Sequence, residues 1–304
     1  MRLNRTFGPI LVFGEVLHDV YPDRRQLGGA PYNYAYHLSQ MGFPVRLISR
    51  VGGDEAGKDI LEYLQKIGFS IEGVQMDIIH KTGEVIVDLN EDGEAEFNIQ
   101  PDRAYDYIEY DPYIDSLARE ENPIIHFGTL IQRHTESANT LKKILQVMAP
   151  KSTVMVDINL RYPFYNEDVI RTSLEYCDIL KINAEELEVL QDLLKIPPSY
   201  HEPVRYLLDA FKIGFACVTK GAYGSALYEA GNPVSFHCSV FPPEKIVDTV
   251  GTGDAYSAML TAGYLASLPK QSLIEKASEF ASRICGIPGA LPENADFYNP
   301  YRFD

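Results

Sequence analysis

A glycine loop joined to an apolar segment, at residues 248–260, constrains the fold more than any other part of the chain. The apolar positions after Asp254 fall mostly on one face at helical spacing, which predicts a buried helix. Just before it, Gly251, Thr252 and Gly253 let the backbone come close to a ligand. The first N–H groups of a helix have no intrahelical partner, and the helix dipole adds positive charge there. The junction therefore predicts an anion site, with phosphate as the usual anion.

Asp254 has two interpretations. Aspartate is a good helix cap, and capping is its commoner use. A carboxylate beside a bound phosphate is repelled by it, but it is needed where an alcohol must lose a proton as it attacks a phosphoryl group. The four residues from Gly251 to Asp254 favour the cap when they are considered alone.

The composition is that of an ordinary globular protein, with 304 residues, of which 45% are hydrophobic and 23% charged. This length suits one large α/β domain or two small ones. The formal net charge of -16 argues against general binding to nucleic acid or to anionic membranes, because both rely on basic patches. No apolar run is long enough to span a membrane, so we expect a cytoplasmic protein. The four cysteines show no Cys-x-x-Cys spacing, and Cys217 and Cys285 are predicted to be core thiols.

Polar side chains stand after the first predicted strand and at the start of the first predicted helix. Residues 9–15 are predicted to form a buried strand, and Asp19 after it fits the mouth of a site or a solvated turn about equally well. Gly28 and Gly29 precede a predicted helix start. Asn33 offers the donor and the acceptor that a sugar hydroxyl needs, and it could equally cap a helix.

The next segments change pattern. Residues 45–51 are predicted to form a second core strand, and residues 57–67 a helix. Residues 82–99 then alternate around an Asp-Gly turn at residues 92–93, which indicates a hairpin. A lone hairpin is marginally stable, so it must pack on another element.

From residue 123 onward, strands and helices alternate. Strands are predicted at 124–128, 153–159 and 178–183, and a helix at 137–148. Residues 215–228 are predicted to form a strand, a glycine turn and a second strand.

Polar residues stand at the ends of these strands, where open α/β sheets bind ligands. Asp157, Asn159 and Arg161 end one strand. Asn183 and Glu186 follow another at the spacing of a capping box.

Several of these motifs together resemble the ribokinase-like (PfkB) carbohydrate kinases. Residues 248–256 are similar to the family's C-terminal signature, Asp-Thr-x-Gly-Ala-Gly-Asp-x-Phe, with Thr252 in place of Ala and Tyr256 in place of Phe. Residues 28–35 and 51–57 resemble its N-terminal signature, and the Ala-Pro pair at 30–31 is most similar to fructokinases.

The resemblance implies a fold. It predicts a three-layer α/β/α sandwich with a mostly parallel central sheet, as one domain over residues 1–304. A small β-sheet lid would be formed by two inserted segments, 15–27 and 80–101. Because such lids often double as dimer interfaces, it also makes a homodimer plausible.

The resemblance also implies the roles of the site residues. Asp254 would be the catalytic base, Gly251, Thr252 and Gly253 the anion hole, and Arg161 a cation that faces the substrate or the transferred phosphate. The sugar would be bound by Asp19, Gly28, Gly29, Asn33 and Asn159. The nucleotide side would comprise Asn183, Thr219, Lys220, Gly221, Gly224 and Gly289, although Lys220 is nearly as well explained as a solvated lysine. Glu186 would support Mg²⁺ through water, and Asp248 and Thr249 would lie near a K⁺ site that some relatives have.

These implications predict an ATP-dependent sugar kinase, with D-fructose as the expected substrate and fructose 6-phosphate as the product. Kinases of 2-keto-3-deoxygluconate, ribose or nucleosides remain alternatives, since Asp-x-Asn-x-Arg also occurs in kinases of acidic sugars. A non-catalytic sugar or nucleotide sensor on the same fold is a more distant alternative. A sensor would have no need of a base at Asp254.

Overall fold

The fold is built on one large sheet. The computed structural model describes residues 8–89, 95–120, 124–199, 202–243 and 245–303. In these residues nine strands follow the order β13-β12-β11-β10-β9-β8-β1-β4-β5, and the strands from β11 to β5 run parallel. The strands are β1 Ile10–Phe13, β4 Val45–Gly52, β5 Val74–Asp77, β8 Ile124–Phe127, β9 Thr153–Asp157, β10 Ile179–Asn183, β11 Phe215–Thr219, β12 Ser225–Glu229 and β13 Phe236–Cys238.

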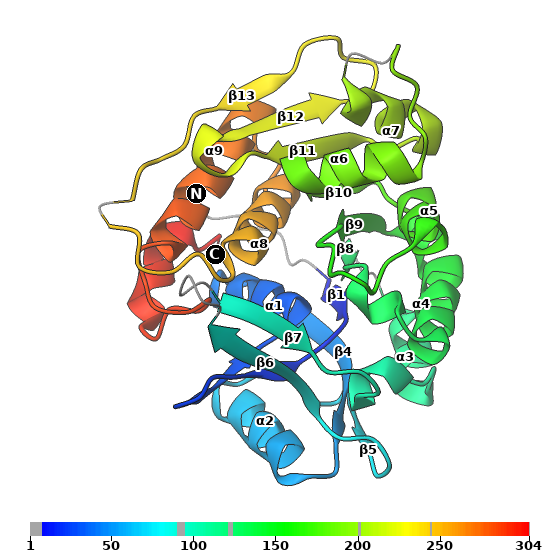
Figure 1. The fold of residues 1–304 in the computed structure, drawn as a ribbon, viewed down its shortest axis with the longest axis vertical. Helices are drawn as coiled ribbons and strands as arrows, with labels where there is room; N and C mark the ends of the chain where they lie inside the picture. The colour runs from blue at the N-terminus through cyan, green and yellow to red at the C-terminus, as the bar shows by residue number, and fades with distance from the viewer. Residues whose placement is uncertain (1–7, 90–94, 121–123, 200–201, 244, 304) are drawn as a thin grey trace.

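Helices cover both faces of this sheet. Side chains alternate along a strand, and in β1 Ile10 and Val12 belong to one buried cluster while Leu11 and Phe13 belong to the other. The first cluster lies under α1 Ala30–Gln40, α2 Glu55–Lys66, α8 Thr252–Leu265 and α9 Lys270–Ile284. The second lies under α3 Pro112–Leu117, α4 Thr135–Met148, α5 Glu167–Glu175, α6 Ala184–Leu193 and α7 Pro203–Phe211. Figure 1 shows α1, α8 and α9 on one side of the sheet and α3, α4 and α5 on the other, which confirms the predicted three layers.

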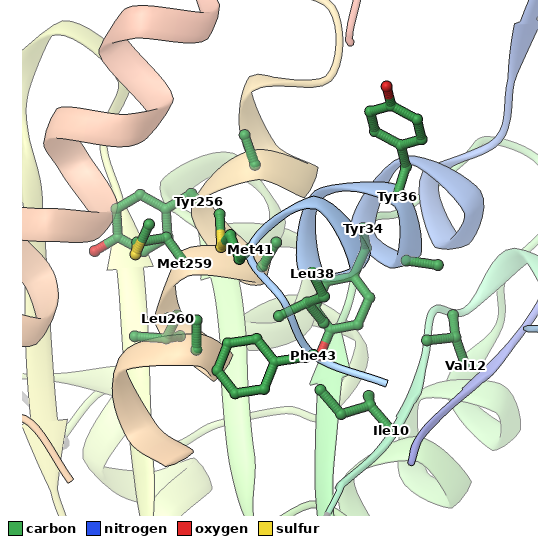
Figure 2. Close-up of a cluster of buried hydrophobic side chains, with 14 of the residues drawn as sticks. Ile10, Val12, Tyr34, Tyr36, Leu38, Met41, Phe43, Tyr256, Met259 and Leu260 are labelled. Carbon is green, nitrogen blue, oxygen red and sulfur yellow. The ribbon is translucent and has the colours of Figure 1, made fainter. Parts of the chain in front are cut away.

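The helix α8 lies in the middle of the first layer. Residues 255–263 are all buried, because α8 is enclosed by α1, α9 and the sheet. Figure 2 shows part of this contact, with Tyr34 and Leu38 from α1 and Met259 and Leu260 from α8. The C-terminal segment, for which the sequence gives no role, closes the layer: the Tyr298 hydroxyl lies 2.8 Å from Nδ1 of buried His37.

A second, four-stranded sheet lies beside the large one (Figure 1) and has the order β3-β2-β6-β7. Its strands are β2 Leu17–Val20, β3 Arg25–Gly28, β6 Gly83–Leu89 and β7 Ala95–Ile99. They fall in the two segments expected for a lid, and the predicted turn at residues 92–93 lies outside the described residues. Asp54 anchors this sheet to α2, since its carboxylate accepts hydrogen bonds from the Gly57 and Thr82 backbone N–H groups. The closing motion of this sheet and the single-domain assignment stay predictions.

Two strands are clearly shorter than the sequence predicts: the one expected over 9–15 is β1, Ile10–Phe13, and the other is β9. The strand expected over 153–159 ends at Asp157, because Asn159 has a φ of 42°, in the left-handed region that ends an extended strand. In the turn that follows, the Leu160 N–H donates to Oε1 of Glu186 at 2.9 Å. None of the helices in the described ranges combines the length and the apolar character that crossing a bilayer requires.

The helix α4 offers a test of the second layer. Ile144 is fully buried, whereas Val147 on the same helix is 46% exposed. We expect Ile144→Ala to lower the free energy of unfolding by about 2–5 kcal/mol, because it removes core contacts and leaves a cavity. The matched control, Val147→Ala, should cost less than about 0.5 kcal/mol. Urea unfolding measures both, and equal costs would show that the packing face of α4 is wrongly assigned.

Candidate active site

The predicted site residues meet at one edge of the large sheet. The parallel strands β9, β10 and β11 end at Asp157, Asn183 and Thr219, and all three carboxyl ends lie at this edge. In an open α/β sheet this edge is where ligands bind.

The start of α8 is uncapped by any side chain. Its N-cap is Gly251, which has a φ of 73° and no capping side-chain hydrogen bond. A Cβ on Gly251 would collide with Ala290, so the loop passes Ala290 closely only because this residue is glycine. The hydroxyl of Thr252 donates to the Thr249 carbonyl at 2.8 Å and fixes the loop. The Thr252 N–H makes a long bond of 3.4 Å to the Thr249 carbonyl, whereas the N–H groups of Gly253 and Asp254 have no hydrogen-bond partner among the described residues and are open to an anion.

Asp254 does not cap the helix, so that interpretation is wrong. It lies in the first turn of α8, and its Oδ2 accepts a hydrogen bond from Nδ2 of Asn33 in α1 at 2.8 Å. Its pKa is raised to about 7, chiefly by burial, and Asp157 raises it further. The hydrogen bond from Asn33 and the charges of Lys181 and Arg161 act in the opposite direction. A carboxyl group with this pKa can take up and release a proton near neutral pH.

Asp19, in β2, faces this site from the small sheet. A Cβ on Gly28 would collide with the Asp19 carboxylate, and one on Gly29 would lie 2.6 Å from the Glu15 carbonyl oxygen. The absence of a side chain at both glycines thus lets the backbone lie close to these oxygen atoms. Gly29 has a φ of 109° as the N-cap of α1. Burial raises the pKa of Asp19 to about 6, against the lowering effect of Arg161.

Arg161 is an exposed cation at the centre of these carboxylates. Its guanidinium donates to the Leu160 carbonyl at 3.1 Å, and it forms no ion pair with another described residue. Its charge nevertheless lowers the pKa of Asp19 and Asp254. An unpaired guanidinium at this edge is suited to an anionic group.

The predicted capping box at the start of α6 is confirmed. Oδ1 of Asn183 accepts from the Glu186 N–H at 2.7 Å, and Oε2 of Glu186 accepts from the Asn183 N–H at 2.8 Å. The other oxygen of Glu186 accepts from the Leu160 N–H at 2.9 Å, which ties α6 to the segment before Arg161. Because both carboxylate oxygens already accept N–H groups, Glu186 fits a role toward a cation through water better than direct ligation.

The glycine loop after β11 lies next to this box, since Asn183 and Thr219 are register partners. Gly221 and Gly224 both have positive φ, at 52° and 83°, and the Lys220 N–H donates to the Gly224 carbonyl at 2.8 Å. The side chain of Lys220 is exposed and has no hydrogen bond or ion pair among the described residues, so both of its interpretations stay open.

Asp248 holds two loops together. Its Oδ1 accepts from the Val250 N–H and its Oδ2 from the Gly289 N–H, both at 3.0 Å. Gly289 has a φ of 69°, and a Cβ there would collide with the side-chain amide of Gln26 from β3. Through Gln26, the small sheet thus contacts Gly289, one of the predicted nucleotide-binding residues.

Sequence reasoning missed several residues of this site. Lys181 lies in β10 beneath α8, Ser257 lies on α8 itself, and Gln26 of β3 lies against Gly289. Glu15 and His126 line a cavity of about 10 Å³ beside Asp254, Asp157 and Asn159, which is room for one water molecule. Among these residues, only Lys181 could have been identified from the sequence. A lysine inside an apolar strand is expected to be buried, and a buried charge must have a partner. Cys285, predicted to be in the core, is only partly buried and lies 3.4 Å from the Thr252 hydroxyl.

The contact between Asn33 and Asp254 predicts a measurable ionisation. Asn33→Ala removes the side-chain hydrogen bond that lowers the pKa of Asp254, so this pKa should rise above its value of about 7. The ¹³C NMR titration of labelled aspartate carboxyls measures the shift. Asn299→Ala, at an exposed asparagine near the C-terminus, is the matched control and should leave the Asp254 titration unchanged. An unchanged or lower pKa in Asn33→Ala would contradict the geometry.

Comparison with known proteins agrees with this geometry. The pfkB family carbohydrate kinase profile matches residues 10–295. The chain is 28% identical over 281 residues to a sugar kinase of Pyrococcus horikoshii, covering 86% of this chain and 84% of that one. It is 26% identical over 309 residues to the fructokinase of Klebsiella pneumoniae, covering 98% of each chain.

A solved structure is similar over nearly the same length. It is that of an uncharacterized sugar kinase from Pyrococcus horikoshii in complex with ATP, with a TM-score of 0.79 and 25% identity, covering 92% of this chain and 93% of that one. The family match spans almost the whole chain, including both ends of the site. This protein therefore belongs to the pfkB family of carbohydrate kinases and is a sugar kinase.

Proposed function

We propose that this sugar kinase transfers the γ-phosphate of ATP to D-fructose and forms fructose 6-phosphate. The observation that carries the mechanism is Asp254, with a pKa of about 7, beside the uncapped N-terminus of α8. The similarity to fructokinases, such as that of Klebsiella pneumoniae, supports the substrate. The ATP complex of the similar Pyrococcus horikoshii kinase supports the donor.

Asp254 takes the proton from the sugar hydroxyl as the hydroxyl attacks the γ-phosphate in line. The negative charge on the phosphoryl oxygens is stabilised by the backbone of Gly251, Thr252 and Gly253 and by Arg161. These donors belong to a helix start and to a turn fixed by Glu186, so they need no rearrangement during the reaction.

The sugar is bound between the two sheets. Asp19 and Asn33 accept and donate hydrogen bonds to its hydroxyls, while Gly28 and Gly29 provide close backbone approach and Asn159 lines the cavity beside Asp254. Closure of the small sheet, which already touches Gly289 through Gln26, would exclude water and protect ATP from hydrolysis.

The nucleotide is bound along the neighbouring strand ends. Asn183, Thr219, Lys220, Gly221 and Gly224 surround its phosphates, and Gly289 lies beside its base. Mg²⁺ would be held by the ATP phosphates and, through water, by Glu186, where it neutralises phosphate charge. The K⁺ site fits less well, because both oxygens of Asp248 already accept N–H groups and Thr249 accepts from Thr252. We assign K⁺ no step.

We further propose a cytoplasmic homodimer that forms through the small sheet. The edge strand β7 presents Phe97, which is 47% exposed. Exposed apolar side chains on an edge strand favour pairing with a second copy.

Two alternatives remain. Arg161 could pair with the carboxylate of 2-keto-3-deoxygluconate, which favours a kinase of an acidic sugar, and ribose or a nucleoside would use the same base. A sensor without activity is disfavoured, because binding alone does not need a carboxylate with a raised pKa directly beside the open N–H groups that would hold a phosphoryl group.

A panel of substrates tests the proposal. ADP release with Mg²⁺ and ATP is measured against fructose, ribose, 2-keto-3-deoxygluconate, adenosine and fructose 6-phosphate. We expect the highest kcat/KM with fructose. A different leading sugar would reject fructose and keep the mechanism, whereas ATP binding without turnover on any of them would reject both.

Replacing the base tests the mechanism. Asp254→Asn keeps the size of the side chain but cannot take the proton, so kcat should fall by roughly 10²- to 10⁴-fold while ATP and sugar still bind. The same change at exposed Asp209 should leave kcat unaltered. Steady-state kinetics and calorimetric binding measure the two effects, and near-normal turnover in Asp254→Asn would eliminate this residue as the base.

A further inference from the structure

A buried ion pair that the proposed reaction does not use lies beneath the first turn of α8. Lys181 in β10 and Asp157 in β9 are register partners, and Nζ of Lys181 lies 3.1 Å from Oδ1 of Asp157. Each side chain is only 6% exposed. Met155 and Ile179 stand two residues before them and pack under α1 and α8. Because side chains alternate along a strand, Asp157 and Lys181 face the same layer.

The pair supports α8 at two points. The Ser257 hydroxyl donates to Oδ2 of Asp157 at 2.7 Å. A Cβ built on Gly253 would lie 3.1 Å from Nζ of Lys181, which is tighter than an ordinary contact. The ammonium group therefore lies directly against the helix turn that carries Asp254.

Stability does not explain such a pair. The cost of removing two charges from water cancels much of their attraction, and apolar replacements of buried pairs are often neutral or stabilising. The location offers a better explanation, since both charges act on the Asp254 carboxylate, Asp157 by repulsion and Lys181 by attraction.

We propose that Lys181 and Asp157 are positioning residues for Asp254. The pair holds the first turn of α8 against the sheet, and its two opposite charges balance the electrostatic field at the carboxylate. This inference rests on the proposed function of Asp254 as the base.

Groups from every neighbouring element act on Asp254. They are Asn33 from α1, Asp157 from β9, Lys181 from β10 and Arg161 from the turn after β9. Two further titratable groups, Glu15 and His126, line the adjoining cavity. Burial lowers the pKa of His126 to about 4, so it is neutral at the working pH, and burial raises the pKa of Glu15.

The two members of the pair must act in opposite directions. Asp157→Asn removes the repelling charge, so Asp254 should lose its proton at lower pH. Lys181→Met removes the attracting charge and leaves Asp157 uncompensated, so Asp254 should lose its proton at higher pH. The double variant removes both charges and should return close to the wild type. A purely structural role would lower activity in both single variants without opposite shifts.

The acid limb of the kcat/KM profile against pH measures this effect, because it reports ionisation in the free enzyme. The assay uses the full chain with Mg²⁺, ATP and the best sugar of the panel. The wild-type limb should lie near pH 7, and it should move by about one pH unit downward in Asp157→Asn and upward in Lys181→Met. Asp178→Asn is the matched control at the other end of β10, where Asp178 accepts from the Val154 N–H at 2.8 Å, and its limb should not move.

Unmoved limbs, or shifts of both single variants in the same direction, would overturn the inference. If Lys181→Met does not fold, the other two variants still test the inference. The acid limb should shift in Asp157→Asn and should stay close to that of the wild type in the double variant. Turnover in Asp254→Asn would reject the proposed base itself. An inactive Asp254→Asn together with unmoved limbs would reject only the role of the pair.

Discussion

The hydrogen bond between Asn33 and Asp254 is the contact on which the site depends. It joins the first turns of α1 and α8, two helices that pack side by side over the sheet and begin at the same edge. Asp254 is the third residue of α8, behind the N-cap Gly251, and its carboxylate accepts the hydrogen bond from Asn33. No side chain caps α8, so the N–H groups of Gly253 and Asp254 are open to a phosphoryl group, with the carboxylate beside them. The neutral amide of Asn33 thus holds the Asp254 carboxylate beside the N–H groups at the start of α8, although a phosphate bound there would repel that carboxylate.

The proposed site must bind a polyanion, the triphosphate of ATP, in a protein that is itself acidic. The net charge is -16, and the proposed site includes the carboxylates of Asp19, Asp157, Glu186 and Asp254. Local charges offset this field: the helix start, the exposed guanidinium of Arg161 and the buried ammonium of Lys181. Most of the carboxylates are also committed to partners, because Asp157 binds Lys181 and Ser257 while Glu186 binds backbone N–H groups. Protein partners thus occupy these carboxylates, while the exposed guanidinium of Arg161 and the start of α8 remain available to the ligand.

Much of this arrangement could be predicted from the sequence, because it depends on local pattern. The helix start at Gly251 and the capping box at Asn183 are short-range features with strong residue preferences. The alternation of strands and helices predicts a sheet whose carboxyl ends meet, which brings the polar strand tips together.

What could not be predicted depends on register and on tertiary contact. The partnership of Lys181 with Asp157 requires knowing which residues of β9 and β10 lie opposite each other. The loop of Asp254 considered alone favours a cap, whereas the structure makes Gly251 the N-cap and pairs Asp254 with Asn33, 221 residues away in the sequence. The end of β9 was misplaced because the left-handed turn at Asn159 has no unique signature in the sequence.

A crystal structure with fructose and a non-hydrolysable ATP analogue tests the central claim most directly. The account predicts a fructose hydroxyl within hydrogen-bond reach of the Asp254 carboxylate, in line with a γ-phosphate held at the N-terminus of α8. A sugar hydroxyl that instead faces another acid or base, with the γ-phosphate away from α8, would contradict it.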